Sequence, residues 1–150
     1  MENDEATAAQ HGYYLEDLAL GMSAVFGKTF TDADVLAFAG ASGDVNPLHI
    51  NEAFARSTRF GRRIIHGMLT TSVWSTLVGT KLPGPGSAYM SQETRFLRPV
   101  YVGDTVTGKA TVSAIDHDKQ RVSLDTECEV EGRRVAVGEA LVWVPRREDA

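Results

Sequence analysis

One long uncharged segment limits most strongly how this chain can fold. Residues 67–79, GMLTTSVWSTLVG, contain no Asp, Glu, Lys or Arg. Apolar side chains recur there at helical spacing, at Leu69, Val73, Trp74, Leu77 and Val78. A helix with this much apolar surface must be nearly buried. The rest of the chain therefore has to supply a layer that covers it.

Strand-like runs follow this predicted helix, after a turn, KLPGPGS, whose prolines and glycines cannot continue a regular element. They cover residues 87–96, 105–115, 121–130 and 134–144. The third run alternates most regularly, with one face formed by Val122, Leu124, Thr126, Cys128 and Val130. Short connectors at 116–119 and 131–132 favour antiparallel hairpins. This pattern predicts an α+β domain in which an antiparallel sheet wraps a long central helix.

The composition is that of an ordinary globular protein. The chain has 150 residues, of which 43% are hydrophobic and 23% charged, so we expect a single domain over residues 1–150 with an ordered core at about 13–145. A net charge of -5 provides no overall attraction to nucleic acid or to an anionic membrane. Residues 1–12 lack periodicity and residues 146–150 are mostly charged, so we expect frayed ends.

A cytoplasmic location is expected from three further features. Cys128 is the only cysteine, which excludes an intrachain disulfide and a cysteine-based zinc site. The acidic N-terminus lacks the basic and apolar regions of a secretory signal. The longest uncharged stretch contains many Thr, Ser, Gly and Pro residues, unlike a membrane-spanning helix.

A second helix is predicted to begin after Thr31, following a strand at residues 22–30. The Thr31 side chain can cap it, and two aspartates in its first turn suit the helix dipole. Either Gly40 or Gly43 can end it.

The next segment, residues 44–55, carries the most specific chemical pattern. Asn46 precedes Pro47 and is biased away from helical geometry, so we expect a rigid loop. Such a turn can direct Asp44 and His49 toward one cavity. A carboxylate and an imidazole suit the addition of water to a polarised double bond, because that reaction takes a proton from water and delivers one to carbon.

The same residues also suit a purely structural turn. In that alternative, Asp44 and Asn46 bond to their own backbone and His49 caps a helix or strand. Spacing alone does not decide between the two.

The segment SGDVNPLHINEAFA resembles the signature of MaoC-like (R)-specific enoyl-CoA hydratases, whose core is G-D-x-N-P-apolar-H. The matching residues are Gly43, Asp44, Asn46, Pro47 and His49. The resemblance continues through HGML at 66–69, LPGPGS and FLRPVYVGDTVTGKATV, and covers roughly residues 20–145. It implies a hot-dog fold, usually a homodimer, and hydration of trans-2-enoyl-CoA. It implies no metal and no separate cofactor, since coenzyme A is part of the substrate.

The resemblance also places further residues in the site. The Gly67 amide, at the start of the central helix, suits the stabilisation of negative charge on the thioester oxygen. Ser72 matches a family serine that helps arrange the site, although a serine in a buried helix can instead bond back to a carbonyl. Asn46 and Met68 are candidate substrate contacts. His66 is expected only to shape the turn before Gly67.

An arginine-rich stretch follows the signature. The last two of its four arginines, Arg62 and Arg63, are candidate ligands for the coenzyme A phosphates. A solvated loop face is the alternative.

Two other functions compete with hydration. A hot-dog thioesterase would direct water at the thioester carbonyl, and its signature is a lone carboxylate. A non-catalytic acyl-thioester-binding subunit could keep the fold and lose the site. The intact Asp44–His49 pair favours hydration over both, and leaves open the acyl chain length and the physiological direction.

Overall fold

The computed structural model describes residues 2–149 and contains one antiparallel sheet, one long helix and several short helices. In chain order the elements are α1 (Glu2–Ala8), η1 (Leu15–Asp17), β1 (Ser23–Thr29), α2 (Asp32–Ser42), α3 (Pro47–Ile50), α4 (Glu52–Arg56), α5 (Gly67–Thr80), β2 (Ala88–Phe96), β3 (Thr105–Asp116), β4 (Arg121–Val130), β5 (Arg133–Trp143) and η2 (Arg147–Asp149).

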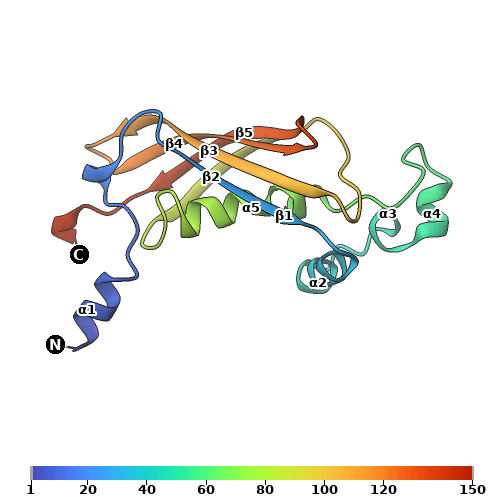
Figure 1. The fold of residues 1–150 in the computed structure, drawn as a ribbon, viewed down its shortest axis with the longest axis horizontal. Coiled ribbons are helices and arrows are strands. Elements are labelled where there is room, and N and C mark those ends of the chain that lie inside the picture. Colours follow the sequence, from blue (N-terminus) through green and yellow to red (C-terminus); the bar gives the residue numbers. More distant parts are fainter. Residues whose placement is uncertain (1, 150) are drawn as a thin grey trace.

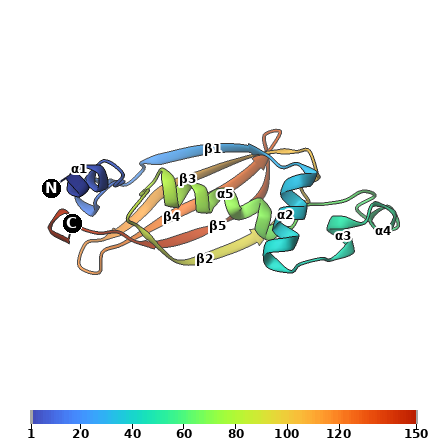
Figure 2. The ribbon, with the colours of Figure 1, turned by 90° about the horizontal axis from the view of Figure 1, so that it is seen from below.

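The sheet has the strand order β1-β3-β4-β5-β2, and every neighbouring pair is antiparallel. Strands β3, β4 and β5 form the expected meander, while β1 and β2 occupy the two edges. Helix α5 lies along one face of the sheet (Figure 1), and seen from that face it runs between the two edge strands (Figure 2). The predicted α+β class, with a long helix against an antiparallel sheet, is confirmed.

The core lies between α5 and the sheet. The predicted inward face of β4 is confirmed, since Val122, Leu124, Thr126 and Cys128 are all buried. The helix contributes Val73, Trp74, Leu77 and Val78 to the same cluster of buried residues. Trp74 also satisfies its polar atom, because its Nε1 donates to the Glu127 carbonyl oxygen at 3.1 Å. Burial raises the pKa of the Cys128 thiol to about 12, which makes this cysteine a packing residue rather than a nucleophile.

The predicted helix after Thr31 is confirmed, with its signals as expected. The Thr31 hydroxyl accepts from the Asp34 amide, and the Asp34 carboxylate accepts from the Thr31 amide. Gly43, not Gly40, follows the helix, with a left-handed φ of 80° that favours glycine.

The prediction of an irregular loop at residues 44–55 was wrong. Asn46 is extended, with φ -51° and ψ 126°, but the short helices α3 and α4 follow it. Proline restricts the residue before it, whereas at the first helical position its own fixed φ favours a helix. The carboxamide oxygens of Asn46 and Asn51 accept from the amides of Leu48 and Phe54 and so cap both helices.

The fraying of the chain ends stays a prediction, and both ends carry short elements. Residues 2–8 form α1, and Arg147 near the other end pairs with Asp17 and lies over the Tyr14 ring. The two ends of the chain consequently lie at the same end of the sheet (Figure 1). Met1 and Ala150, which share the prediction, lie outside the described residues.

We expect Gly108→Ala to destabilise the fold by about 1–3 kcal/mol, because α5 packs directly on this position of β3. A methyl carbon added there would lie 2.7 Å from Cγ2 of Val73. Gly27→Ala on β1 is the matched control, since an added carbon meets nothing within 4 Å. Urea denaturation of both variants measures the difference, and equal stabilities would contradict the proposed close helix–sheet contact.

Candidate active site

The site begins where α2 ends. The Gly43 amide donates to the Ala39 carbonyl oxygen at 2.9 Å and closes the helix, so the chain turns and Asp44 follows at once. The Asn46 amide donates to Oδ1 of Asp44 at 3.2 Å, which fixes one carboxylate oxygen and leaves the other for a ligand. His49 follows as the third residue of α3. Residues 43–49 thus form a hydrogen-bonded turn that carries both predicted side chains.

A backbone carbonyl oxygen holds one ring nitrogen of His49, and the other ring nitrogen can act as a base. Its side chain is 8% exposed, and its Nδ1 lies 2.8 Å from the Ile64 carbonyl oxygen. Because a carbonyl can only accept, Nδ1 carries the hydrogen and the neutral ring keeps a lone pair on Nε2. Burial lowers the pKa of His49, an effect that the hydrogen bond to Ile64 opposes, while nearby His66 lowers it further and Asp44 raises it.

His66 joins this pair, which the sequence did not indicate. It is 2% exposed, and its ring centroid lies 3.9 Å from that of His49 and 4.7 Å from that of Phe38. Its Nε2 lies 2.9 Å from the carbonyl oxygen of Asp44. The signal that could have found it is its position directly before Gly67, because the start of a central helix is where a site can meet the helix dipole.

A cavity of about 290 Å³ opens beside His49. Gly67 also lines it and is the first residue of α5, so its amide lies ahead of the helix's own hydrogen-bond ladder and can donate to a ligand. Most of the remaining wall is apolar, and Arg59 and Arg98 lie at it. A Cβ added at Gly67 would lie 2.9 Å from two ring carbons of Phe96, which explains why this helix begins with glycine.

Two other predicted residues lie elsewhere. Met68, 64% exposed, and Ser72 line a separate groove of about 460 Å³, together with Phe38, Trp74 and Tyr89. The Ser72 hydroxyl donates to the Leu69 carbonyl oxygen at 2.6 Å, which is the alternative considered for it. Within one chain, the structure does not bring Ser72 into the cavity of His49.

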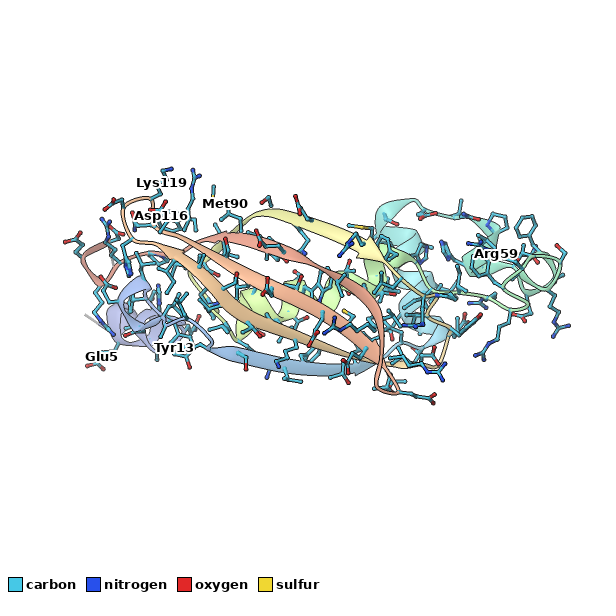
Figure 3. All side chains as sticks on the ribbon, turned by 90° about the horizontal axis from the view of Figure 1, so that it is seen from above. Glu5, Tyr13, Arg59, Met90, Asp116 and Lys119 are labelled. Atoms are coloured by element: carbon cyan, nitrogen blue, oxygen red, sulfur yellow. The ribbon has the colours of Figure 1, made fainter. Side chains whose placement is uncertain are left out.

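The arginines of the basic stretch have different surroundings. Arg63 pairs with Asp32, and its Nε donates to the His49 carbonyl oxygen at 2.7 Å. It therefore supports the backbone of His49. Arg62 stacks over the Tyr101 ring, with 4.0 Å between its guanidinium carbon and the ring centroid. Arg59 projects at the end of the molecule opposite Asp116 and Lys119 (Figure 3). Two arginines of this stretch are paired with carboxylates, Arg63 with Asp32 and Arg56 with Glu52.

Asp44, His49 and His66 are also the group best placed to hold a metal ion, with one ligand atom from each within 4.8 Å of the others. Their arrangement suits a metal poorly. The two ring planes are tilted by 32° with their centroids 3.9 Å apart, and Nδ1 of His66, the nitrogen that the Asp44 carbonyl oxygen does not occupy, is fully buried. A zinc ion requires lone pairs arranged in a tetrahedron, whereas a hydrogen-bonded water between such groups does not.

Three comparisons bear on what this geometry does. The family model for the MaoC like domain matches residues 18–133. An (R)-specific enoyl-CoA hydratase of Rhodospirillum rubrum is 46% identical over 135 residues, which are 90% of this chain and 94% of that protein. A 3-hydroxybutyryl-CoA dehydratase of Methylorubrum extorquens is 43% identical over 91% of this chain and 87% of its own length.

The solved structures agree with the sequences. The (R)-hydratase from Aeromonas caviae involved in PHA biosynthesis superposes with a TM-score of 0.84 and 44% identity, covering 87% of this chain and 99% of that one. The expected hot-dog fold is therefore confirmed by a close structural relative. With a model match over most of its length and relatives above 40% identity, this chain belongs to the MaoC-like hydratase and dehydratase family.

Proposed function

We propose that this protein is an (R)-specific enoyl-CoA hydratase that adds water across the double bond of trans-2-enoyl-CoA, and catalyses the reverse dehydration. One observation carries the proposal: a buried neutral His49, with its Nε2 lone pair free, shares a cavity wall with the amide at the start of α5 and lies beside the Asp44 carboxylate. The names of the close relatives support the substrate class and the hydro-lyase chemistry.

In the proposed mechanism, Asp44 and His49 hold one water between them. His49 Nε2 takes a proton as the water oxygen bonds to the β-carbon, and the double-bond electrons move toward the thioester oxygen. The Gly67 amide donates to that oxygen, aided by the helix dipole. The resulting enolate takes a proton at the α-carbon from the imidazolium, which restores neutral His49. Water is consumed, the thioester stays intact, and no metal or cofactor takes part.

Coenzyme A binding is assigned to the arginines that remain available. Arg59 and Arg98 lie at the wall of the His49 cavity, and Arg62 stacks on the nearby Tyr101. Guanidinium groups suit phosphate oxygens. Arg63 is better assigned to supporting His49, because its side chain is 17% exposed and its guanidinium is already paired with Asp32. The apolar groove beside Met68 offers room for acyl carbons.

A homodimer that joins β2 edges fits the exposed surface. Among the strands of residues 2–149, β2 pairs only with β5, so its other edge can offer backbone groups to a partner. Apolar side chains are exposed along this edge and next to it, at Met68, Tyr89, Met90, Phe96 and Leu97. Exposed apolar surface of this kind marks an interface. No helix among residues 2–149 is long and apolar enough to cross a membrane. We propose a cytoplasmic location, the one expected from the sequence.

Purified enzyme should deplete the enoyl-thioester absorbance of crotonyl-CoA and form the (R)-3-hydroxyacyl product. Asp44→Asn and His49→Ala should each lower kcat about a hundredfold or more, the usual contribution of a positioned acid or base. Asp116→Asn and His117→Ala, on the exposed β3–β4 hairpin, are matched controls that should keep full activity. Prior treatment with a chelator should leave the rate unchanged.

Three results would overturn this assignment. Release of free thiol without loss of the double bond would make the protein a thioesterase. If the folded Asp44→Asn and His49→Ala variants keep near-normal turnover, the fold stands but Asp44 and His49 have no catalytic role. If the wild type binds enoyl-CoA without either reaction, a non-catalytic binding role would replace the proposal.

Gly67→Ala should lower kcat about tenfold or more, although it keeps the backbone amide. The added methyl must displace the Phe96 ring or shift the start of α5, and small displacements of a donor are costly in catalysis. Gly79→Ala, in the same helix but with open space around an added carbon, should keep full activity and gain stability. Equal activity of the two variants would argue against Gly67 as the oxyanion donor.

A further inference from the structure

His66 is a buried imidazole whose hydrogen-bonding state the structure defines. Its Nε2 lies 2.9 Å from the Asp44 carbonyl oxygen, which can only accept, so Nε2 carries the hydrogen. Its Nδ1 is fully buried and has no hydrogen-bond partner among residues 2–149. A hydrogen on Nδ1 would therefore have no acceptor, and this ring fits its surroundings only with a lone pair there.

The same ring forms one wall around His49. The two centroids are 3.9 Å apart, and Phe38 covers His66 at 4.7 Å. A positive charge on either ring would be repelled by a charge on the other. The His66 ring also shields His49 from water, and this burial favours the uncharged form of His49.

Charged groups reach His49 from each element packed around it. The Asp44 carboxylate approaches from the turn after α2, and Arg59 lines the same cavity from the segment that follows α4. Arg63 donates to the His49 carbonyl oxygen and is neutralised by Asp32 of α2. His66 is the one group among these that contacts the imidazole ring face to face.

We propose that His66 is a positioning residue with two separable effects. Its Nε2–H holds the Asp44 turn against the start of α5, and its ring, packed against the ring of His49, keeps His49 in the basic form by excluding water. The catalytic consequence rests on the proposed function, whereas the effect on His49 can be measured without any substrate.

Two substitutions separate these effects. His66→Gln keeps an N–H that can reach the Asp44 carbonyl oxygen but removes the ring. His66→Phe keeps a ring against His49 but removes the donor. His117→Gln, on the exposed hairpin, is the control for loss of a histidine. The readouts are the titration of the His49 ring by NMR on labelled enzyme, the pH profile of kcat/KM, and thermal stability.

For His66→Gln we expect the pKa of His49 to rise toward its ordinary value, and the acidic limb of the kcat/KM profile to move to higher pH with it. For His66→Phe we expect kcat to fall tenfold to a hundredfold with KM changed less than threefold, because Asp44 loses its anchor. His117→Gln should match the wild type in every readout.

An unchanged His49 titration in folded His66→Gln would overturn the proposed effect of the ring. Loss of activity in both variants in proportion to lost thermal stability, with unmoved pH profiles, would reduce His66 to a core residue. If His66→Phe does not fold, the glutamine variant still decides. If the NMR shift occurs in a protein without hydratase activity, the positioning effect stands and the proposed function fails.

Discussion

The packing of α5 against the β3–β4 face determines where every part of the site lies. Burial of one face of this helix fixes its axis, as the close approach of Val73 to Gly108 shows. The first turn of α5 extends beyond the tightly packed core, and Gly67 in this turn lines the cavity beside His49. A donor at the start of a helix is useful only if the helix cannot shift, so core stability and oxyanion stabilisation depend on the same contact.

The chemistry depends on backbone carbonyl oxygens that determine which ring nitrogen of each imidazole carries the hydrogen. Ile64 and Asp44 accept from His49 and His66, respectively, and each bond selects one ring nitrogen as the donor. Histidine near neutral pH is otherwise a mixture of tautomers and charge states. Burial and the neighbouring His66 favour a neutral His49, and the contact with Ile64 leaves the lone pair on Nε2, which is the state needed to accept a proton from water.

Periodicity was enough to predict the architecture. The uncharged run of α5 and the alternation of β4 indicated a buried helix against a sheet, and Thr31 marked the start of α2. The position of β2 beside β5 was not predictable, because strand order depends on long-range pairing that no local pattern encodes. The helices α3 and α4 were missed because the restriction that Pro47 places on Asn46 was extended to the residues after it.

The signature predicted which residues the turn would hold, but not their surroundings. His49 and Gly67 line the same cavity, and the Asp44 carboxylate lies near the His49 ring. The role of Arg63 in bracing His49 could not be foreseen, because Asp32 is distant in sequence and comes near only through the fold. His66 seemed to be a turn residue for the same reason: its contact with His49 joins two segments that no spacing relates. Ser72 kept the local hydrogen bond that its position in a helix allows.

Hydration of a trans-2-enoyl-CoA in ¹⁸O-labelled water tests the central claim most directly, because the label shows which carbon the activated water attacked. The account predicts one ¹⁸O at the β-carbon of an intact (R)-3-hydroxyacyl thioester, with the rate of labelling lost in Asp44→Asn and His49→Ala. Label in a free carboxylate would contradict it, since water would then have attacked the thioester carbonyl instead.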